Sequence, residues 1–430
     1  MEPKEKMTLP RSLAEAPVVT GTATSHVAPK FPMAILLGSL FISTVGIGFV
    51  VPFLPVFATE LGATGFALGF IMAAFSLSMV ITQPLAGSYS DRLGRKFFLV
   101  AGLAVYSVGG FLYVLSSSVG DIVLVRFLQG IGGGLIFSVS MAYMGDLAPE
   151  GYEGRYMGVY NVTMLSGFGL GPLLGGVLKD TFGMNMAFYG MGLSSAIACI
   201  LVLFLLPESR TRDVRAESQR LFAVFGEILA QTRTRGILLI RFSVMLSMVP
   251  SFIFLPVLMT QVMDASGIQI GMVITVRTLV SASLQYPFGW LADRHSRVVM
   301  TVASVFGMAA VVSLVGLATQ FWHVLLLFGL LGVNEALFMP ANSAMILEGG
   351  RSHGMGATMG LFNTAMTMGM FVGSLGAGLL VDAFGFRIAF MLVGVIVALS
   401  ASVSVPMMTA TPRECSSSKQ IGPHLPDAPP

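Results

Sequence analysis

Two short polar stretches decide the fold: GSYSDRLGR at Gly87–Arg95 and GWLADRHSR at Gly289–Arg297, which lie 202 residues apart. The same offset relates two further pairs, MGVYN at 157–161 with MGLFN at 359–363 and KDTFGMNMAF at 179–188 with VDAFGFRIAF at 381–390. An offset that holds along most of the chain indicates an internal repeat. We therefore expect two units of the same topology.

Apolar residues surround these polar stretches. Of the 430 residues, 55% are apolar and only 10% are charged, whereas an ordinary soluble domain has about 25% charged residues. The mean hydropathy is +0.83. This composition excludes a soluble, collagen-like or disordered chain and predicts an all-α integral membrane protein.

Each half contains six apolar stretches that are long enough to span a bilayer, which takes about 20 residues. The expected helices cover 33–57, 66–88, 97–116, 121–144, 154–178, 186–206, 236–261, 268–290, 298–318, 322–347, 355–380 and 386–408. We expect two pseudo-symmetric six-helix bundles at 33–206 and 236–408, a basic linker at 207–235, and polar tails at 1–32 and 409–430. Two such bundles can rock about a central site, which is the physical basis of alternating access.

The basic residues predict the orientation of the helices, because Lys and Arg accumulate in cytoplasmic loops. With both termini in the cytoplasm, Lys179 and Arg387 are the only basic residues in loops on the opposite side. The linker alone contributes Arg210, Arg212, Arg215, Arg220, Arg233 and Arg235. We therefore expect both tails in the cytoplasm and a multi-pass protein of the plasma membrane, or of an internal membrane derived from it.

The first repeated stretch, Gly87–Lys96, resembles the signature of the major facilitator superfamily position by position. RFLQGIGGG from Arg126 is similar to that family's helix 4 motif, and GFGLGPLLGG at Gly167–Gly176 is similar to the helix 5 motif of its drug:proton antiporters. The second half departs from the pattern, because Ser374 stands where helix 5 has a proline. The resemblance covers nearly the whole chain and implies a central cavity lined by helices 1, 2, 4, 5, 7, 8, 10 and 11.

Glycines and charges in these motifs are gating candidates. Gly87 and Gly94 suit a tight loop, since glycine tolerates backbone conformations that other residues avoid. Asp91 lies where the N-terminus of the eleventh helix is expected, so its carboxylate would latch the halves on free backbone N–H groups, and Asp293 would do the same for the fifth helix. The other gating candidates are Arg92, Arg95, Asp146, Arg294 and Arg297, with Gly171 for close helix approach and Pro172 for a kink. The alternatives are purely topogenic charges and tight packing.

Arg126, Arg277 and Glu335 lie inside expected helices, where a charge costs a few kcal/mol, and they are candidates for proton coupling. Burial of Glu335 would favour its protonated form, as a proton carrier requires. Protonation would break a pair with Arg277 and so couple proton to cargo. The alternatives are a fixed ion pair and, for Arg126, a hydrogen bond to helix carbonyls. Polar cavity contacts are expected from Gln129, Asn161, Asn334, Asn342 and Asn363.

These patterns favour a secondary active transporter of a small solute, coupled to protons and, by the resemblance of helix 5, exporting. Helix 1 lacks the acidic residue of many drug exporters, which favours a neutral, zwitterionic or anionic cargo, including a metal chelate or siderophore. Two alternatives stay open. One is an importer or facilitator of such a solute, of iron or of another metal ion, and the other is a non-transporting sensor or assembly factor.

The sequence holds no GxxxxGK[ST], HExxH or GxSxG motif, so neither direct use of ATP nor an enzymatic site is expected. Cys199 and Cys415 show no metal-ligand spacing, and the net charge of +3 on dispersed residues gives no reason to expect nucleic acid. We expect no cofactor or metal, a proton gradient as the energy source, and a monomer. Protein partners, if any, would bind the tail and the linker.

Overall fold

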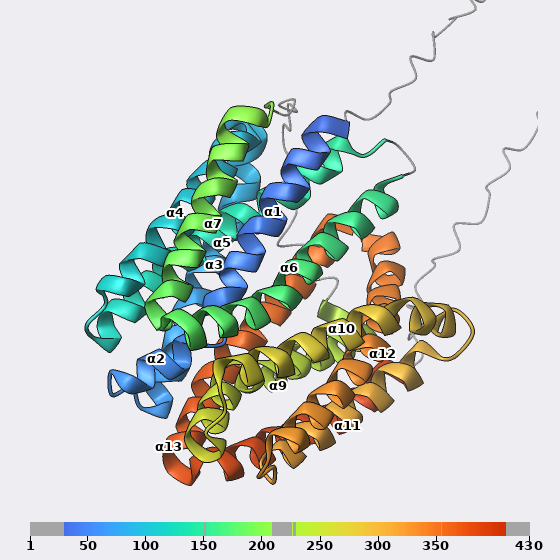
Figure 1. The fold of residues 1–430 in the computed structure, drawn as a ribbon. Coiled ribbons are helices and arrows are strands. Elements are labelled where there is room, and N and C mark those ends of the chain that lie inside the picture. Colours follow the sequence, from blue (N-terminus) through green and yellow to red (C-terminus); the bar gives the residue numbers. More distant parts are fainter. Residues whose placement is uncertain (1–29, 150–151, 209–225, 227–228, 354, 410–430) are drawn as a thin grey trace, which may run out of the picture.

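The computed structural model describes residues 30–149, 152–208, 226, 229–353 and 355–409, and every regular element in these ranges is a helix (Figure 1). The predicted tails and most of the predicted linker lie outside the described residues. The first half contains α1 (Lys30–Val50), α2 (Leu54–Glu60), α3 (Gly65–Leu93), α4 (Arg95–Leu115), α5 (Val119–Leu147), α6 (Glu153–Phe182) and α7 (Met184–Leu205). The second contains α9 (Thr232–Met263), α10 (Gly267–Ala292), α11 (Arg297–Val315), α12 (Phe321–His353) and α13 (Met355–Thr409).

Eleven helical segments in the described ranges are long and apolar enough to cross a membrane, with α1 and α2 forming one of them. The longest helix, α13, has 55 residues, which would give a length of about 80 Å against a hydrocarbon thickness of about 30 Å. It is broken at Gly385, whose φ of 77° and ψ of 168° are open to glycine but not to other residues. Gly183, at the equivalent repeat position between α6 and α7, has φ 86° and ψ 168°. Division of α13 at Gly385 gives twelve spans, consistent with the prediction.

The first span is interrupted where the sequence predicts one helix over 33–57. α1 ends at Val50 and α2 begins at Leu54. Pro52 explains the break, since it has no N–H to donate to the carbonyl of Gly48. The break lies at the cavity described below, which Val51 and Pro52 help to line.

The helices α3 and α10 run further than predicted, and this corrects the role given to Gly87. α3 continues to Leu93, so Gly87 lies inside a helix and not in a tight loop. The turn is made by Gly94 alone, at φ 96°. The backbone conformation favours glycine there, and a Cβ atom at Gly94 would also lie 2.7 Å from the carboxyl carbon of Glu208, so that side chain would have to shift.

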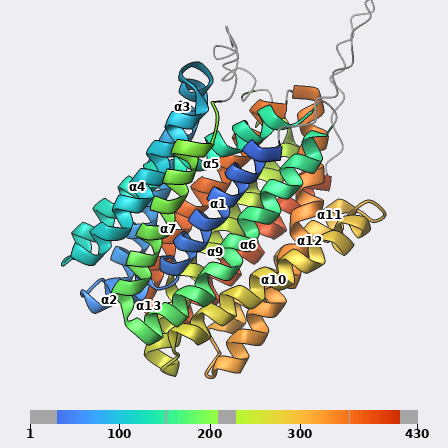
Figure 2. The same cartoon turned by 45° about the horizontal axis from the view of Figure 1, so that its top comes forward.

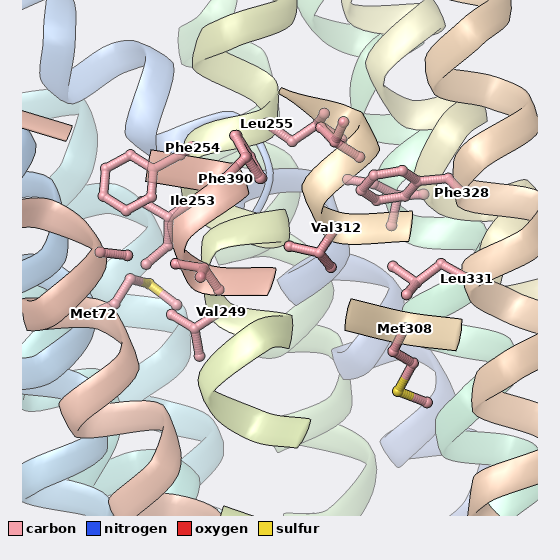
Figure 3. Close-up of a cluster of buried hydrophobic side chains, with 14 of the residues drawn as sticks. Met72, Val249, Ile253, Phe254, Leu255, Met308, Val312, Phe328, Leu331 and Phe390 are labelled. Atoms are coloured by element: carbon pink, nitrogen blue, oxygen red, sulfur yellow. The ribbon is translucent and has the colours of Figure 1, made fainter. Parts of the chain in front are cut away.

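The two halves meet along α3 against α13 and along α6 against α10 (Figures 1 and 2). Glycines allow the backbones to touch: a Cβ atom at Gly69 would overlap the carbonyl oxygen of Ser374, and one at Gly271 would overlap that of Pro172. Small residues at such crossings are typical of helix packing in membranes. The largest buried apolar cluster includes side chains from both halves, and Figure 3 shows Met72 of α3 near Val249 and Ile253 of α9.

Two names distinguish the ends of the bundle. The basic end contains the last residues of α3, α5, α7 and α10, and the far end contains the connections at 61–65, 115–119, 183–184 and 263–267. By the charge rule the basic end is the predicted cytoplasmic one. In Figure 1, α6 and α10 approach each other at the far end, where α6 ends and α10 begins, and diverge towards the basic end.

Candidate functional site

A cavity of about 210 Å³ lies between the two halves. Its wall is mostly apolar, and its two charged residues face each other across α10 and α12. The lining residues are Gly48, Val51, Pro52, Leu165, Phe168, Pro172, Met248, Phe252, Ile274, Arg277, Thr278, Ser281 and Glu335. An apolar cavity with a few convergent polar groups is the usual form of a small-molecule site.

Arg277 and Glu335 form a two-point ion pair in this wall. Arg277 Nε donates to Glu335 Oε2 at 3.1 Å and Nη2 donates to Oε1 at 3.4 Å. The side chains are 2% and 15% exposed. The guanidinium lies 4.7 Å from the ring centre of Phe252 and 5.9 Å from that of Phe328, and its Nη1 has no hydrogen-bond partner in the described part of the chain. The pair is therefore intact, largely dehydrated and still has one unused donor.

Prolines free two backbone carbonyls beside this pair. Pro52 follows Gly48 by four residues and Pro172 follows Phe168 by four, so neither carbonyl meets the N–H that a regular helix would offer. Both Gly48 and Phe168 line the cavity. Each proline thus leaves one residue of the cavity wall with a carbonyl that has no regular helical partner.

Arg126 and Gln129 lie inside the first half and do not line the cavity, contrary to the expectation from sequence. Arg126 is 2% exposed and stacks 5.6 Å from the ring centre of Phe75, while Gln129 Oε1 accepts from Tyr113 Oη at 2.7 Å. The reason is that Arg126, Gln129 and Gly130 lie on one face of α5, and this face packs against α3 and α4. Nε and Nη2 of Arg126 find no hydrogen-bond partner among the residues described, carbonyls included.

None of the four predicted asparagines is among the residues that line this cavity. Asn334 packs on Gly307 of α11 and donates to the carbonyl of Leu330 at 2.8 Å. Asn342 is fully buried and accepts from Arg241 Nη1 at 3.1 Å. Asn161 and Asn363 are exposed on the basic-end parts of α6 and α13.

The hydroxyls that do line the cavity, Thr278 and Ser281, are absent from the sequence-based prediction. Ser281 follows Arg277 by one helical turn on α10, so the i, i+4 spacing could have identified it.

The basic end holds a charge cluster within the first half. Arg95 pairs with Asp146 through two nitrogens, one of them Nη2 to Oδ1 at 3.1 Å, and with Asp91 at 3.0 Å. Glu208 Oε1 accepts from the backbone N–H groups of Arg95 at 2.6 Å and Lys96 at 3.1 Å. Two of the gating candidates, Arg95 and Asp146, are therefore in direct contact. The predicted docking of Asp91 on the eleventh helix stays a prediction, and the side chain of Arg92 lies outside the described residues.

The second-half copy of this motif is open. Asp293 ends α10, lies 3.8 Å from Arg297 Nη2 and has a side chain that is 76% exposed. Arg294 stacks 3.8 Å from the ring centre of Trp290. A Cβ atom at Gly289, the second-half equivalent of Gly87, would lie 3.9 Å from Pro340 Cβ, which is ordinary van der Waals contact. Asp293 is thus not covered by the fifth span in this conformation.

The far end carries two carboxylate contacts between the halves, which the sequence analysis missed. Asp382 accepts from the N–H groups of Gly65 and Phe66 at 2.6 and 2.7 Å. Asp180 accepts from those of Gly267 and Ile268 at 2.7 and 2.8 Å. The available signal was the repeat itself, since KDTFG and VDAFG place both aspartates at one repeat position. Gly171 lies on another seam, where its Cβ would be 2.6 Å from Gly48 Cα of α1.

Comparison with known proteins supports this architecture in both halves. The family model described as Major Facilitator Superfamily matches residues 36–251 and 237–424. An uncharacterised MFS-type transporter of Methanocaldococcus jannaschii is 28% identical over 76% of this chain and 85% of its own length. The structure of a bacterial homologue of the human lysosomal transporter Spinster, in an inward-facing and unoccupied conformation, has a TM-score of 0.75 at 12% identity, covering 88% of this chain and 96% of that one.

Relatives with assigned activities match a shorter region. The multidrug resistance protein 2 of Bacillus subtilis is 32% identical over 42% of this chain and 45% of its own length. The quinolone resistance protein NorA of Staphylococcus aureus is 31% identical over 41% of this chain and 45% of its own length. The chain therefore spans less than half of these two proteins, whereas the family model covers both of its halves. This chain belongs to the major facilitator superfamily and is a multi-pass membrane transporter of small solutes.

Proposed function

We propose that the chain is a proton-coupled transporter in which Glu335 takes up the proton and Arg277 senses it. The observation that carries the proposal is the largely dehydrated, two-point ion pair in the wall of the cavity between the halves. A carboxylate in this place is a functional candidate by default, because charges inside the membrane are costly.

Protonation of Glu335 would remove the negative half of this pair. Removal of one partner from a buried pair costs about 3–5 kcal/mol, because it leaves an uncompensated charge. Arg277 already has one unused donor, so it would then seek an acceptor on the cargo or on the moving halves. Proton binding and cargo binding would in this way act on the same guanidinium.

Export by antiport is the favoured direction. Its support is the similarity of the Gly167–Gly176 segment to the helix 5 motif of drug:proton antiporters, together with the partial likeness to the two resistance proteins. The cavity, at about 210 Å³, is smaller than the 300–1,000 Å³ of most ligand sites. A drug-sized cargo would therefore have to be bound in a wider conformation.

Import or facilitated passage of an anionic or neutral solute is the second candidate. Charge in the described interior favours it: Arg126 and Arg277 are buried and Arg241 is partly buried, whereas Glu335 is the one carboxylate that pairs with any of these three arginines in the described part of the chain. A bound anion would compensate the positive charge of the interior, whereas a lipophilic cation would add to it.

The test is proton flux in liposomes that hold the purified protein under an imposed pH gradient. Wild type and Glu335→Gln are compared with Glu60→Gln, a matched control at an exposed helix end. The cargo panel contains a fluoroquinolone, a quaternary ammonium dye, organic anions, sugars, amino acids and a ferric chelate. We expect cargo-dependent proton flux in wild type and Glu60→Gln and none in Glu335→Gln.

The sign of the flux separates the candidates. Proton movement against the cargo indicates antiport, and movement with it indicates symport. Equal flux in Glu335→Gln and wild type would remove Glu335 from the coupling mechanism. Cargo movement without any proton flux would indicate a facilitator.

A further inference from the structure

We infer that Asp180 and Asp382 are the positioning residues that hold the far end of the transporter closed, as a symmetric pair of latches between the halves. This inference rests on alternating access, which the proposed function assumes, but not on the coupling role of Glu335. The latches are contacts of a carboxylate with the first two backbone N–H groups of a helix in the opposite half.

The two latches are copies of each other. Asp180 and Asp382 differ by the repeat offset, and so do their acceptor sites at Gly267 and Gly65. Each carboxylate uses both oxygens, one for each N–H, at 2.6–2.8 Å. The bonds cross between the halves in both directions, so rocking the halves apart at this end must break all four.

The helix ends are built to receive a carboxylate. The first N–H groups of a helix have no internal partner, and the helix dipole makes them attractive to anions. Thr64 and Ser266 cap α3 and α10 with their own hydroxyls, but these reach only the third N–H, at Ala67 and Gln269. The first two N–H groups of each helix are left for the aspartate of the other half.

Glycine makes the approach possible. A Cβ atom at Gly65 would lie 2.7 Å from Asp382 Oδ1, and one at Gly267 would lie 2.6 Å from Asp180 Oδ1. One turn further along, Gly69 and Gly271 touch the backbone of the opposite half. A Cβ atom at Gly87, near the other end of α3, would meet nothing within 4 Å. The cross-half contact is thus concentrated at the latched ends.

When a latch opens, neither its carboxylate nor its N–H groups are left without a hydrogen-bond partner. The carboxylate and the two N–H groups of each latch lie at a helix end, where water replaces the lost partner once the halves separate. Such an exchange suits a contact that forms and breaks in every transport cycle. The latches therefore bias the equilibrium between open and closed far ends without fixing it.

The experiment measures access to the cavity from each side of the membrane. Cys199→Ser and Cys415→Ser remove the native thiols, and Thr278→Cys places a reporter on the cavity wall. A membrane-impermeant maleimide is added to one face at a time, and Phe384→Cys, exposed at the far end, identifies that face. The variants are Asp180→Asn, Asp382→Asn and both together.

Asp121→Asn is the matched control. Asp121 is another carboxylate at a far-end helix start, but it accepts from the N–H groups of Ser117 and Ser118 in its own half. We expect far-side labelling of Thr278→Cys to rise at least tenfold in the double variant, by an intermediate factor in each single variant, and not at all in Asp121→Asn. A tenfold change corresponds to about 1.4 kcal/mol.

A distance measurement gives a second reading that does not depend on the reporter. Spin labels at Phe182→Cys and Phe384→Cys occupy equivalent, exposed positions in the two halves. We expect the double variant to gain a population with a longer distance. If the double variant has an unchanged melting temperature but the same labelling and distances as Asp121→Asn, the latch proposal is overturned. If the double variant does not fold, the same comparison is made with the two single variants. Neither measurement needs cargo or protons, so a failure of Glu335 as proton carrier would leave this result standing.

Discussion

Both ends of the molecule use a carboxylate to cap a helix, but with different connections. At the far end, Asp180 and Asp382 cap helices of the opposite half. At the basic end, Glu208 caps α4 of its own half, and Arg95 binds Asp146 there as well. The same chemistry joins the halves at one end and consolidates a single half at the other. Under the latch proposal, a carboxylate acts on the conformation only where the half that supplies it differs from the half that contains the capped helix.

The largest effect is expected from a bulky side chain at the far-end seam between the halves. Gly69→Leu would place a side chain against the carbonyl of Ser374, where even a Cβ atom overlaps. We expect transport to fall more than about a hundredfold, since overpacking of a close crossing costs a few kcal/mol and prevents closure. Far-side labelling of the Thr278→Cys reporter should rise at the same time.

Gly87→Leu is the control for size, because Gly87 faces open space in this conformation. It should leave far-side labelling unchanged. If both variants raised far-side labelling equally, the proposal that cross-half contact is concentrated at the far end would be wrong.

A smaller effect is expected from a substitution at the basic end. Arg95→Gln removes the pairing with Asp91 and Asp146 inside the first half. Because hydrogen bonds to charged groups contribute about 1.5–3 kcal/mol, we expect the melting temperature in detergent to fall by a few degrees. Far-side labelling should stay at the wild-type value. A large change in labelling with an unchanged melting temperature would show that the cluster acts on gating and not on stability.

The smallest effect separates two turn glycines with the same backbone requirement. Gly94→Ala meets both a positive φ and the Glu208 carboxylate, whereas Gly385→Ala meets only the positive φ, with nothing within 4 Å. A positive φ with ψ of about 150–170° costs a non-glycine residue about 1–3 kcal/mol, so both variants lose stability, and Gly94→Ala loses more because Glu208 must also shift. Melting curves of the two variants measured side by side give the order. Equal losses would show that Glu208 moves aside at no cost.

Hydropathy and the repeat were sufficient to predict the fold class, and the repeat also explains the matching breaks at Gly183 and Gly385. The faces of the helices were not predictable in the same way. In a bilayer the side that faces lipid is as apolar as the side that faces the core, so periodicity does not show which way a residue such as Gln129 or Asn334 points. The predicted ion pair of Arg277 and Glu335 needed no such information, because two opposite charges in the membrane have few other partners.

The latches were missed for another physical reason. Asp180 follows Lys179 at the edge of a predicted span and has the pattern of an ordinary loop charge. Its partners are backbone N–H groups, which every residue except proline has and which leave no mark in the sequence. Only the arrangement of the two halves shows that the carboxylate crosses between them.

The carbonyls of Gly48 and Phe168 have a consequence for the evolution of this site. They belong to the backbone, so no substitution of a cavity side chain can delete them. Only the loss of Pro52 or Pro172 would restore an N–H to pair with them. Any cargo that uses these two carbonyls would therefore keep its hydrogen bonds while the side chains of the cavity change around it.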